Sequence, residues 1–105
     1  MESCMVNQEY IKIISDFFSK NLPQFVQVYS KNTIPYGPFF CIVYNYGVIS
    51  VEICGECGLY IDILIDNTKY GLWQYDKSVN KYASITKSNI ELQLGILKKF
   101  LEDLV

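Results

Sequence analysis

Two neighbouring segments of the chain, Val48–Cys54 and Leu59–Ile65, alternate between apolar and other side chains. Because successive side chains of a strand point to opposite faces of a sheet, this alternation predicts two strands that each bury one face. The apolar sides consist of Ile49, Val51 and Ile53 in the first segment and of Ile61, Ile63 and Ile65 in the second. The short sequence between them, ICGECG, then has to turn the chain back, which predicts an antiparallel hairpin.

Matching the apolar sides fixes the register of this hairpin, because a slip of one residue turns a whole strand over. Ile53 is expected opposite Ile61, and Val51 opposite Ile63. The turn is then Glu56-Cys57-Gly58, with glycine in the last position, where a type I turn plus bulge needs a left-handed residue. Glu52 and Asp62 become neighbours on the polar side of the two strands.

The same rule applies to the preceding hairpin, for which Asn45-Tyr46-Gly47 is the expected loop. This loop pairs Cys41 with Val51 and Val43 with Ile49. It therefore places Cys41 on the apolar face of the sheet and Tyr44 on the opposite, outer face.

The cysteines raise the question of whether the C-x-x-C spacing in ICGECG carries chemistry. Cys41 and Cys54 are expected on opposite faces, so that their sulfurs cannot converge on one zinc ion. No helix follows Cys57 to lower the pKa of a thiol, as a reactive dithiol requires. The spacing favours a turn with free thiols, while a Cys54–Cys57 disulfide or thiol pair and a metal site stay as alternatives.

Amphipathic helices are predicted at both ends of this run of strands. The first covers about Asn7–Asn21, with Asn7 as its cap. The second begins with the capping box Ser88-x-x-Glu91, and Gly95 within it predicts a close approach to the sheet. The apolar stripes are Tyr10, Ile13, Ile14, Phe17 and Phe18 in the first helix and Ile90, Leu94, Leu97, Leu101 and Leu104 in the second.

The order of the segments predicts a single α+β domain over residues 1–105: an antiparallel sheet of four to six strands, flanked by an N-terminal and a C-terminal helix on one face. Phe25–Tyr29 and Phe39–Tyr44 are further strands, and Tyr70–Tyr75 and Lys81–Ile85 are weaker candidates. The expected core consists of Ile49, Val51, Ile53, Ile61, Ile63, Leu94, Leu97 and Leu101.

The composition argues against most enzymes and against nucleic-acid binding. The chain has no His, all 9 basic residues are Lys, and the net charge is −2. It therefore lacks the usual general base and the guanidinium fork that binds phosphates. Phosphate-binding glycine motifs are also missing. We expect no catalytic residues, no cofactor, no metal and no nucleic-acid partner.

The segments that target or insert proteins into membranes are also missing from the sequence. No apolar run approaches the roughly 20 residues that a membrane span needs. The N-terminal sequence MESCMVNQEY does not have the form of a signal peptide. These features predict a cytoplasmic protein that does not bind membranes, and whose cysteines are free thiols.

Aromatic and acidic side chains on the outer face predict a binding surface. Tyrosine and tryptophan supply contact area, and carboxylates steer a basic partner towards it. The candidate partner-binding residues are Tyr44, Glu52, Tyr60, Asp62, Asp66, Trp73 and Tyr75.

The pattern as a whole resembles the small immunity proteins that neutralise bacterial polymorphic or contact-dependent toxins. The resemblance is carried by the amphipathic first helix, the antiparallel meander, the aromatic segment YGLWQYD at Tyr70–Asp76 and the leucine-striped last helix. It implies a cytoplasmic protein that neutralises a toxin by direct contact, with a basic toxin domain as partner.

Three alternative functions stay open at this stage. A phage- or mobile-element-encoded inhibitor would look nearly the same. An interaction subunit could dimerise through a sheet edge or an aromatic face. A thiol-based redox protein would use Cys54 and Cys57. The oligomeric state is open in each case.

Overall fold

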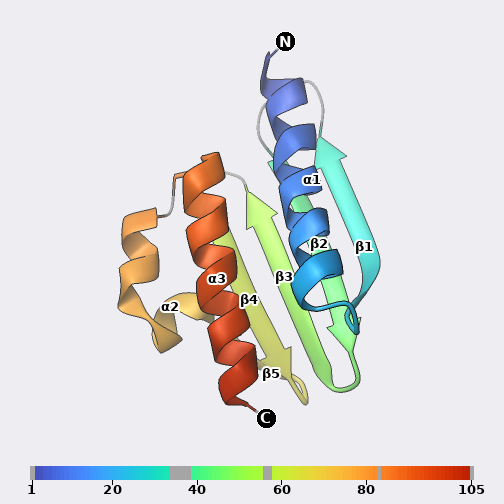
Figure 1. Ribbon diagram of the computed structural model, residues 1–105, viewed down its shortest axis with the longest axis vertical. Helices are drawn as coiled ribbons and strands as arrows, with labels where there is room; N and C mark the ends of the chain where they lie inside the picture. Colours follow the sequence, from blue (N-terminus) through green and yellow to red (C-terminus); the bar gives the residue numbers. More distant parts are fainter. Residues whose placement is uncertain (1, 34–38, 56–57, 83, 105) are drawn as a thin grey trace.

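The structure, a computed structural model, describes residues 2–33, 39–55, 58–82 and 84–104. Within these ranges, five strands form one antiparallel sheet in the order β1-β2-β3-β4-β5, with a long helix at each end of the chain (Figure 1). The elements are α1 Glu2–Asn21, β1 Val26–Thr33, β2 Phe39–Tyr46, β3 Ile49–Gly55, β4 Leu59–Ile65, β5 Thr68–Gly71, α2 Leu72–Tyr75, the 3-10 helix η1 Lys77–Tyr82 and α3 Lys87–Asp103. The predicted α+β fold is confirmed.

Helices α1 and α3 lie side by side on one face of the sheet, as Figure 1 shows. The inner face of the sheet buries Ile42 on β2, Ile53 on β3 and Ile61 on β4, and the helices bury Ile14 and Leu94 against them. The expected core residues are buried except Ile49, which is partly exposed and packs at the edge of the core. None of the described helices covers the opposite face of the sheet, which we call the outer face.

The predicted register is correct for one central hairpin and wrong for the other. Strands β3 and β4 pair Ile53 with Ile61 and Val51 with Ile63, as expected. Strands β2 and β3 instead pair Cys41 with Cys54 and Tyr44 with Val51. The offset from the prediction is an odd number of residues, so β2 presents the opposite side chains to the core.

A two-residue turn causes this difference. Tyr46 pairs with Ile49, which leaves only Gly47 and Val48 to connect β2 and β3. Gly47 has a φ of 61°, as the first central residue of a type II′ turn requires, and glycine adopts this angle without steric cost. Such turns match the twist of the paired strands better than the longer loop that we had expected.

Both long helices begin earlier than their sequence signals predict. Helix α1 begins at Glu2 instead of Asn7. At α3, Thr86 is the N-cap in place of Ser88, because its side chain accepts a hydrogen bond of 3.1 Å from the backbone nitrogen of Asn89. In the described part of the chain, neither of these helices nor α2 combines the length and apolar character that crossing a membrane requires.

The segment after β4 differs most from the prediction, because Tyr70–Tyr75 is not one strand. Strand β5 ends at Gly71, and the chain then turns into the short helix α2, which buries Leu72 in the core. The second weak candidate, Lys81–Ile85, begins inside the 3-10 helix η1 and contains no strand among its described residues. Packing of Leu72 and the turn that follows it override the strand propensity of this aromatic segment.

Two residues of α3 give opposite expectations for the same substitution. Gly95 is exposed, and a Cβ atom added there would meet no other atom within 4 Å, so the predicted approach to the sheet is wrong. Gly95→Ala should therefore stabilise the protein by about 1 kcal/mol through helix propensity. Leu97 is fully buried, and Leu97→Ala should cost roughly 2–5 kcal/mol. Urea unfolding measures both changes, and equal effects at the two positions would contradict the packing of α3.

Candidate partner-binding surface

The outer face carries the side chains that alternate with the buried rows of the sheet. Strand β3 contributes Ser50, Glu52 and Cys54, and β4 contributes Tyr60, Asp62 and Leu64, as expected from the register of these two strands. Strand β2 contributes Cys41 and Val43 as a result of the two-residue turn. On this face the three strands β2, β3 and β4 therefore combine carboxylates, the exposed Tyr60 and a pair of cysteines.

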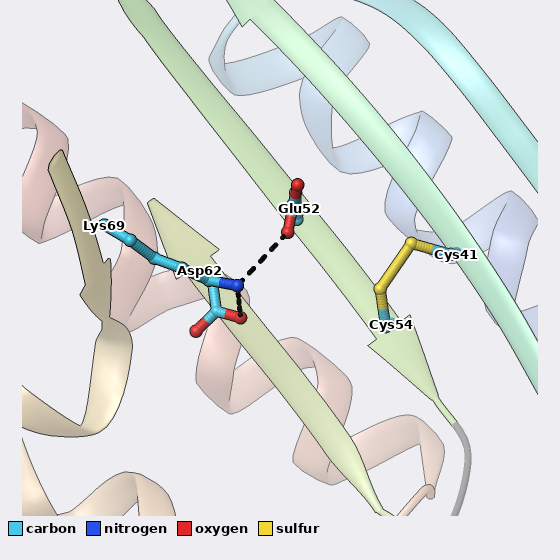
Figure 2. Close-up of a disulfide and its surroundings, with 5 residues drawn as sticks. All are labelled: Cys41, Glu52, Cys54, Asp62 and Lys69. Atoms are coloured by element: carbon cyan, nitrogen blue, oxygen red, sulfur yellow. Dashed lines mark ion pairs between the residues drawn. A yellow bond between two sulfur atoms is a disulfide. The ribbon is translucent and has the colours of Figure 1, made fainter. Parts of the chain in front are cut away.

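A lysine joins the two carboxylates of this face. Glu52 and Asp62 are direct register partners, as predicted. Lys69 on β5 places its Nζ 3.6 Å from Asp62 Oδ2 and 3.9 Å from Glu52 Oε1 (Figure 2). Because all three side chains are partly solvated, the ion pairs add little stability, but they offset the repulsion between the two carboxylates.

Lys69 was not among the residues that the sequence predicted for this surface. Its position follows from the β4–β5 hairpin, in which it pairs with Leu64. The connecting residues Asp66 and Asn67 both have positive φ, 51° and 72°, as in a type I′ turn. The dipeptide Asp66-Asn67 between two apolar segments was the signal that could have revealed this hairpin.

A hollow of about 380 Å³ opens beside the carboxylates, where β4 approaches α2 and η1. Two large aromatic side chains line it: Tyr60 is 55% exposed and Trp73 is 49% exposed. Asp62 lines the same hollow and so connects it to the ion cluster. Three of the predicted partner-binding residues are thus brought together at one place, with Glu52 next to them.

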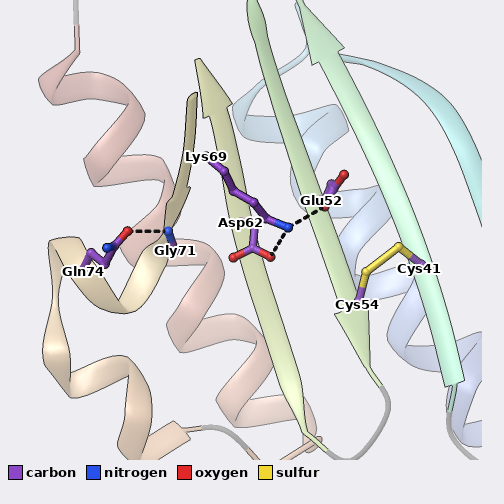
Figure 3. A network of polar contacts seen from close by, with 7 residues as sticks. All are labelled: Cys41, Glu52, Cys54, Asp62, Lys69, Gly71 and Gln74. Atoms are coloured by element: carbon purple, nitrogen blue, oxygen red, sulfur yellow. Dashed lines mark hydrogen bonds and ion pairs between the residues drawn. A yellow bond between two sulfur atoms is a disulfide. The ribbon is translucent and has the colours of Figure 1, made fainter. Parts of the chain in front are cut away.

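Gly71 allows Trp73 to lie against the sheet at this place. Gly71 is the register partner of Asp62, and a Cβ atom built on it would lie 2.5 Å from Nε1 and 2.7 Å from Cδ1 of the indole. Only glycine leaves room for the ring here. The backbone nitrogen of Gly71 also donates a 2.8 Å hydrogen bond to Oε1 of Gln74, which ties β5 to the first turn of α2 (Figure 3).

Tyr44, which the sequence placed on the outer face, lies in the core instead. It is only 4% exposed, and its ring stacks on that of Phe18, with 3.8 Å between the ring centroids. Burial raises the pKa of its hydroxyl, and a hydrogen bond with the Ser15 side chain offsets part of this effect. The prediction is wrong because the two-residue turn reverses the sides of β2.

Tyr75 and Asp66 lie apart from the hollow. The hydroxyl of Tyr75 donates a 2.6 Å hydrogen bond to Oδ2 of Asp103, and its ring packs edge-on against Phe100, so this residue joins α2 to α3. The hydrogen bond to the carboxylate is the main reason why the pKa of Tyr75 is raised. Asp66 is a central residue of the β4–β5 turn, at the end of the sheet opposite to Tyr60.

The cysteines are arranged differently from the prediction. Cys41 and Cys54 face each other across β2 and β3 and form a disulfide, as Figure 2 shows, so these two are not free thiols. The expectation that they lie on opposite faces is wrong for the same reason as for Tyr44. Glu56 and Cys57 lie outside the described residues. The alternative of a Cys54–Cys57 disulfide is wrong, because the sulfur of Cys54 is bonded to that of Cys41. In the described part, His, Cys, Asp and Glu side chains nowhere gather in a group of three or more that could hold a metal ion.

Comparison with protein-family models, with curated proteins and with solved structures finds no match for this chain. Its function therefore has to be argued from the surface itself. Exposed aromatic rings and charged groups lie close together at one part of that surface. This part is the outer face around Tyr60, Trp73, Glu52, Asp62 and Lys69, which we call the Tyr60–Trp73 surface.

The substitution Gly71→Ala should displace the indole of Trp73 without unfolding the chain. The added methyl group needs the space of the ring, and the half-exposed ring can move into solvent. Because the chain has 1 Trp, its fluorescence reports this site alone. We expect a red-shifted emission maximum and stronger quenching by acrylamide, with an unchanged circular dichroism spectrum. Gly95→Ala is the matched control, and an identical spectrum for both variants would contradict the packing of Trp73 on Gly71.

Proposed function

We propose that this chain is a small cytoplasmic immunity protein that neutralises a basic protein toxin by direct contact through the Tyr60–Trp73 surface. It acts by occupying the toxin and has no catalytic role or cofactor of its own. The observation that supports the proposal best is the hollow between two half-exposed aromatic side chains. It lies next to two carboxylates on the sheet face that no described helix covers.

The aromatic residues suit the role of binding anchors. Tyr60 stands on a strand within the sheet, and Trp73 stands on α2 with its ring against Gly71, so both rings are positioned before a partner arrives. Binding to preorganised side chains forfeits little conformational entropy. Half-exposed tyrosine and tryptophan at the rim of a hollow are typical of the residues that dominate the affinity of interfaces.

The charges favour a basic partner. Glu52 and Asp62 together carry two negative charges, and Lys69 compensates one of them. A lysine or arginine of the partner could take the second position between the carboxylates, or replace Lys69. Charges at such a site mainly change the rate of association and its dependence on salt.

The proposal predicts that Tyr60→Ala and Trp73→Ala each weaken toxin binding by about 2 kcal/mol or more, since each removes an aromatic anchor. Immobilised wild-type chain captures its partner from a lysate of the source cells, and surface plasmon resonance then gives the affinity of each variant. Leu92→Ala is the matched control, because Leu92 is an exposed apolar residue of α3, on the other side of the sheet.

A growth assay of cells that produce the captured protein tests whether it is a toxin that this chain neutralises. Cells that produce the captured protein should stop growing unless they also produce the wild-type chain, and the Tyr60→Ala/Trp73→Ala double variant should not protect them. A captured protein without toxicity, or full protection by the double variant, contradicts the proposal.

Charge reversal of Lys69 should speed up association with a basic toxin. Lys69→Glu leaves three carboxylates around the site. The increase in the association rate should become smaller as salt screens the attraction between these carboxylates and the toxin. Lys98→Glu changes the net charge equally, but Lys98 lies on α3 beside Glu102, away from the outer face. Its association rate should therefore change less than that of Lys69→Glu in stopped-flow measurements. Equal rates for the two variants would mean that the toxin binds elsewhere.

A second candidate function, an interaction subunit that dimerises, is favoured by the edge strand β1. This strand pairs with β2 alone in the described sheet, and Val26 and Val28 are 62% and 59% exposed. A free edge with apolar side chains is a template for pairing with another strand. Sedimentation of the isolated chain separates the candidates, since only the second requires a dimer without any other protein present.

A further inference from the structure

The Cys41–Cys54 disulfide lies on the outer face, between two strands in the interior of the sheet. The cysteines are direct register partners, with 4.1 Å between their Cα atoms, and both are partly exposed. Figure 3 shows the bond on the same side of the sheet as Glu52, Asp62 and Lys69, and none of the described helices lies over it. A reagent in solution can therefore reach the sulfur atoms without displacing a layer of the fold.

Contacts other than this bond also hold the register of β2 and β3. Strands β2 and β3 are paired on both sides of the cysteines, from Phe40–Gly55 to Tyr46–Ile49. The neighbouring residues Ile42 and Ile53 point to the inner face and are almost fully buried there. Opening the disulfide breaks one covalent link, but it removes no ladder hydrogen bond and no core contact.

We propose that Cys41 and Cys54 form a reversible thiol–disulfide exchange site, which a dithiol reductant opens while the protein stays folded. A thiolate of the reductant attacks one sulfur of the pair and forms a mixed disulfide, and the other cysteine leaves as a thiolate and takes up a proton. The second thiol of the reductant loses its proton, closes the disulfide of the reductant and releases the first cysteine, which is protonated in turn. Two electrons pass to the protein, which then holds two thiols.

The arrangement of the pair selects a dithiol over a monothiol. After the first attack, the released cysteine remains directly opposite the mixed disulfide, because the sheet holds both strands in register. Its effective concentration is therefore high, so it displaces a monothiol and closes the original bond again. A dithiol resolves the mixed disulfide within one molecule and competes with this return.

In the test, the native chain is treated without denaturant with dithiothreitol or with reduced glutathione at equal thiol concentration. Free thiols are then blocked with N-ethylmaleimide at set times. Cleavage after glutamate, at Glu52 and Glu56, places Cys41, Cys54 and Cys57 on separate peptides for mass spectrometry. Circular dichroism and the fluorescence of Trp73 follow the fold in the same samples.

We expect the fraction of chains with an open Cys41–Cys54 bond to be at least about tenfold higher with dithiothreitol than with glutathione. Both cysteines should be labelled together, and the circular dichroism and fluorescence spectra should not change. Cys41→Ser has no disulfide, so this variant is incubated with oxidised glutathione, whose disulfide the Cys54 thiolate attacks with release of one glutathione thiolate. Because no resolving thiol stands opposite Cys54, this mixed disulfide should accumulate, and the wild-type chain under the same conditions should not show it. Cys54→Ser is the reciprocal variant and should accumulate the adduct on Cys41.

Three results would overturn the proposal. Labelling of both cysteines in the isolated protein before any reductant is added would mean that no bond is present to exchange. Reduction that occurs only in denaturant would mean that reductants cannot reach the bond in the folded protein and that its role is structural. Equal opening by glutathione and dithiothreitol would remove the preference for a dithiol.

Discussion

The apolar rows on the inner face of β2, β3 and β4 must be covered by helices. Most other features of the structure depend on the fact that the described helices cover this face and leave the other one open. Ile42, Ile53 and Ile61 lie next to each other across the three strands and are 1%, 0% and 4% exposed. Strands with one buried face must carry solvent-compatible side chains on the other. The outer face, with its carboxylates and half-exposed tyrosine, is the direct result of this one-sided packing.

The turn between β2 and β3 decides which side chains of β2 face outwards. With Gly47 and Val48 as its central residues, Tyr44 enters the core and stacks on Phe18, while Cys41 comes to lie beside Cys54. A loop longer by one residue on one side would reverse both placements, because the side-chain period of a strand is two. One local turn therefore determines both a part of the core and the chemistry of the outer face.

The outer face brings two kinds of chemistry close together. Cys54 pairs with Tyr60 across β3 and β4, so that the disulfide is a neighbour of the aromatic hollow. In a reducing compartment, disulfides are mostly transient, catalytic or redox-sensing. The proposed cytoplasmic role and the proposed exchange site are compatible for this reason, although each rests on its own observations and each can fail alone.

The sequence by itself determined the order of the elements from α1 to β4 and the closing helix α3, the amphipathic faces of α1 and α3 and the β3–β4 register. These features depend on periodicity over several consecutive residues. It also identified Glu52, Tyr60, Asp62 and Trp73 as surface residues worth testing. It did not predict that Trp73 stands on a short helix, since the burial of Leu72 overrides a local preference for strand. Lys69 and the Cys41–Cys54 disulfide were also decided by the tertiary structure, because each joins residues of different strands whose relative register depends on tight turns. Hydrophobic alternation shows which side of a strand is buried, but only the turns and the packed helices decide which residues of neighbouring strands meet.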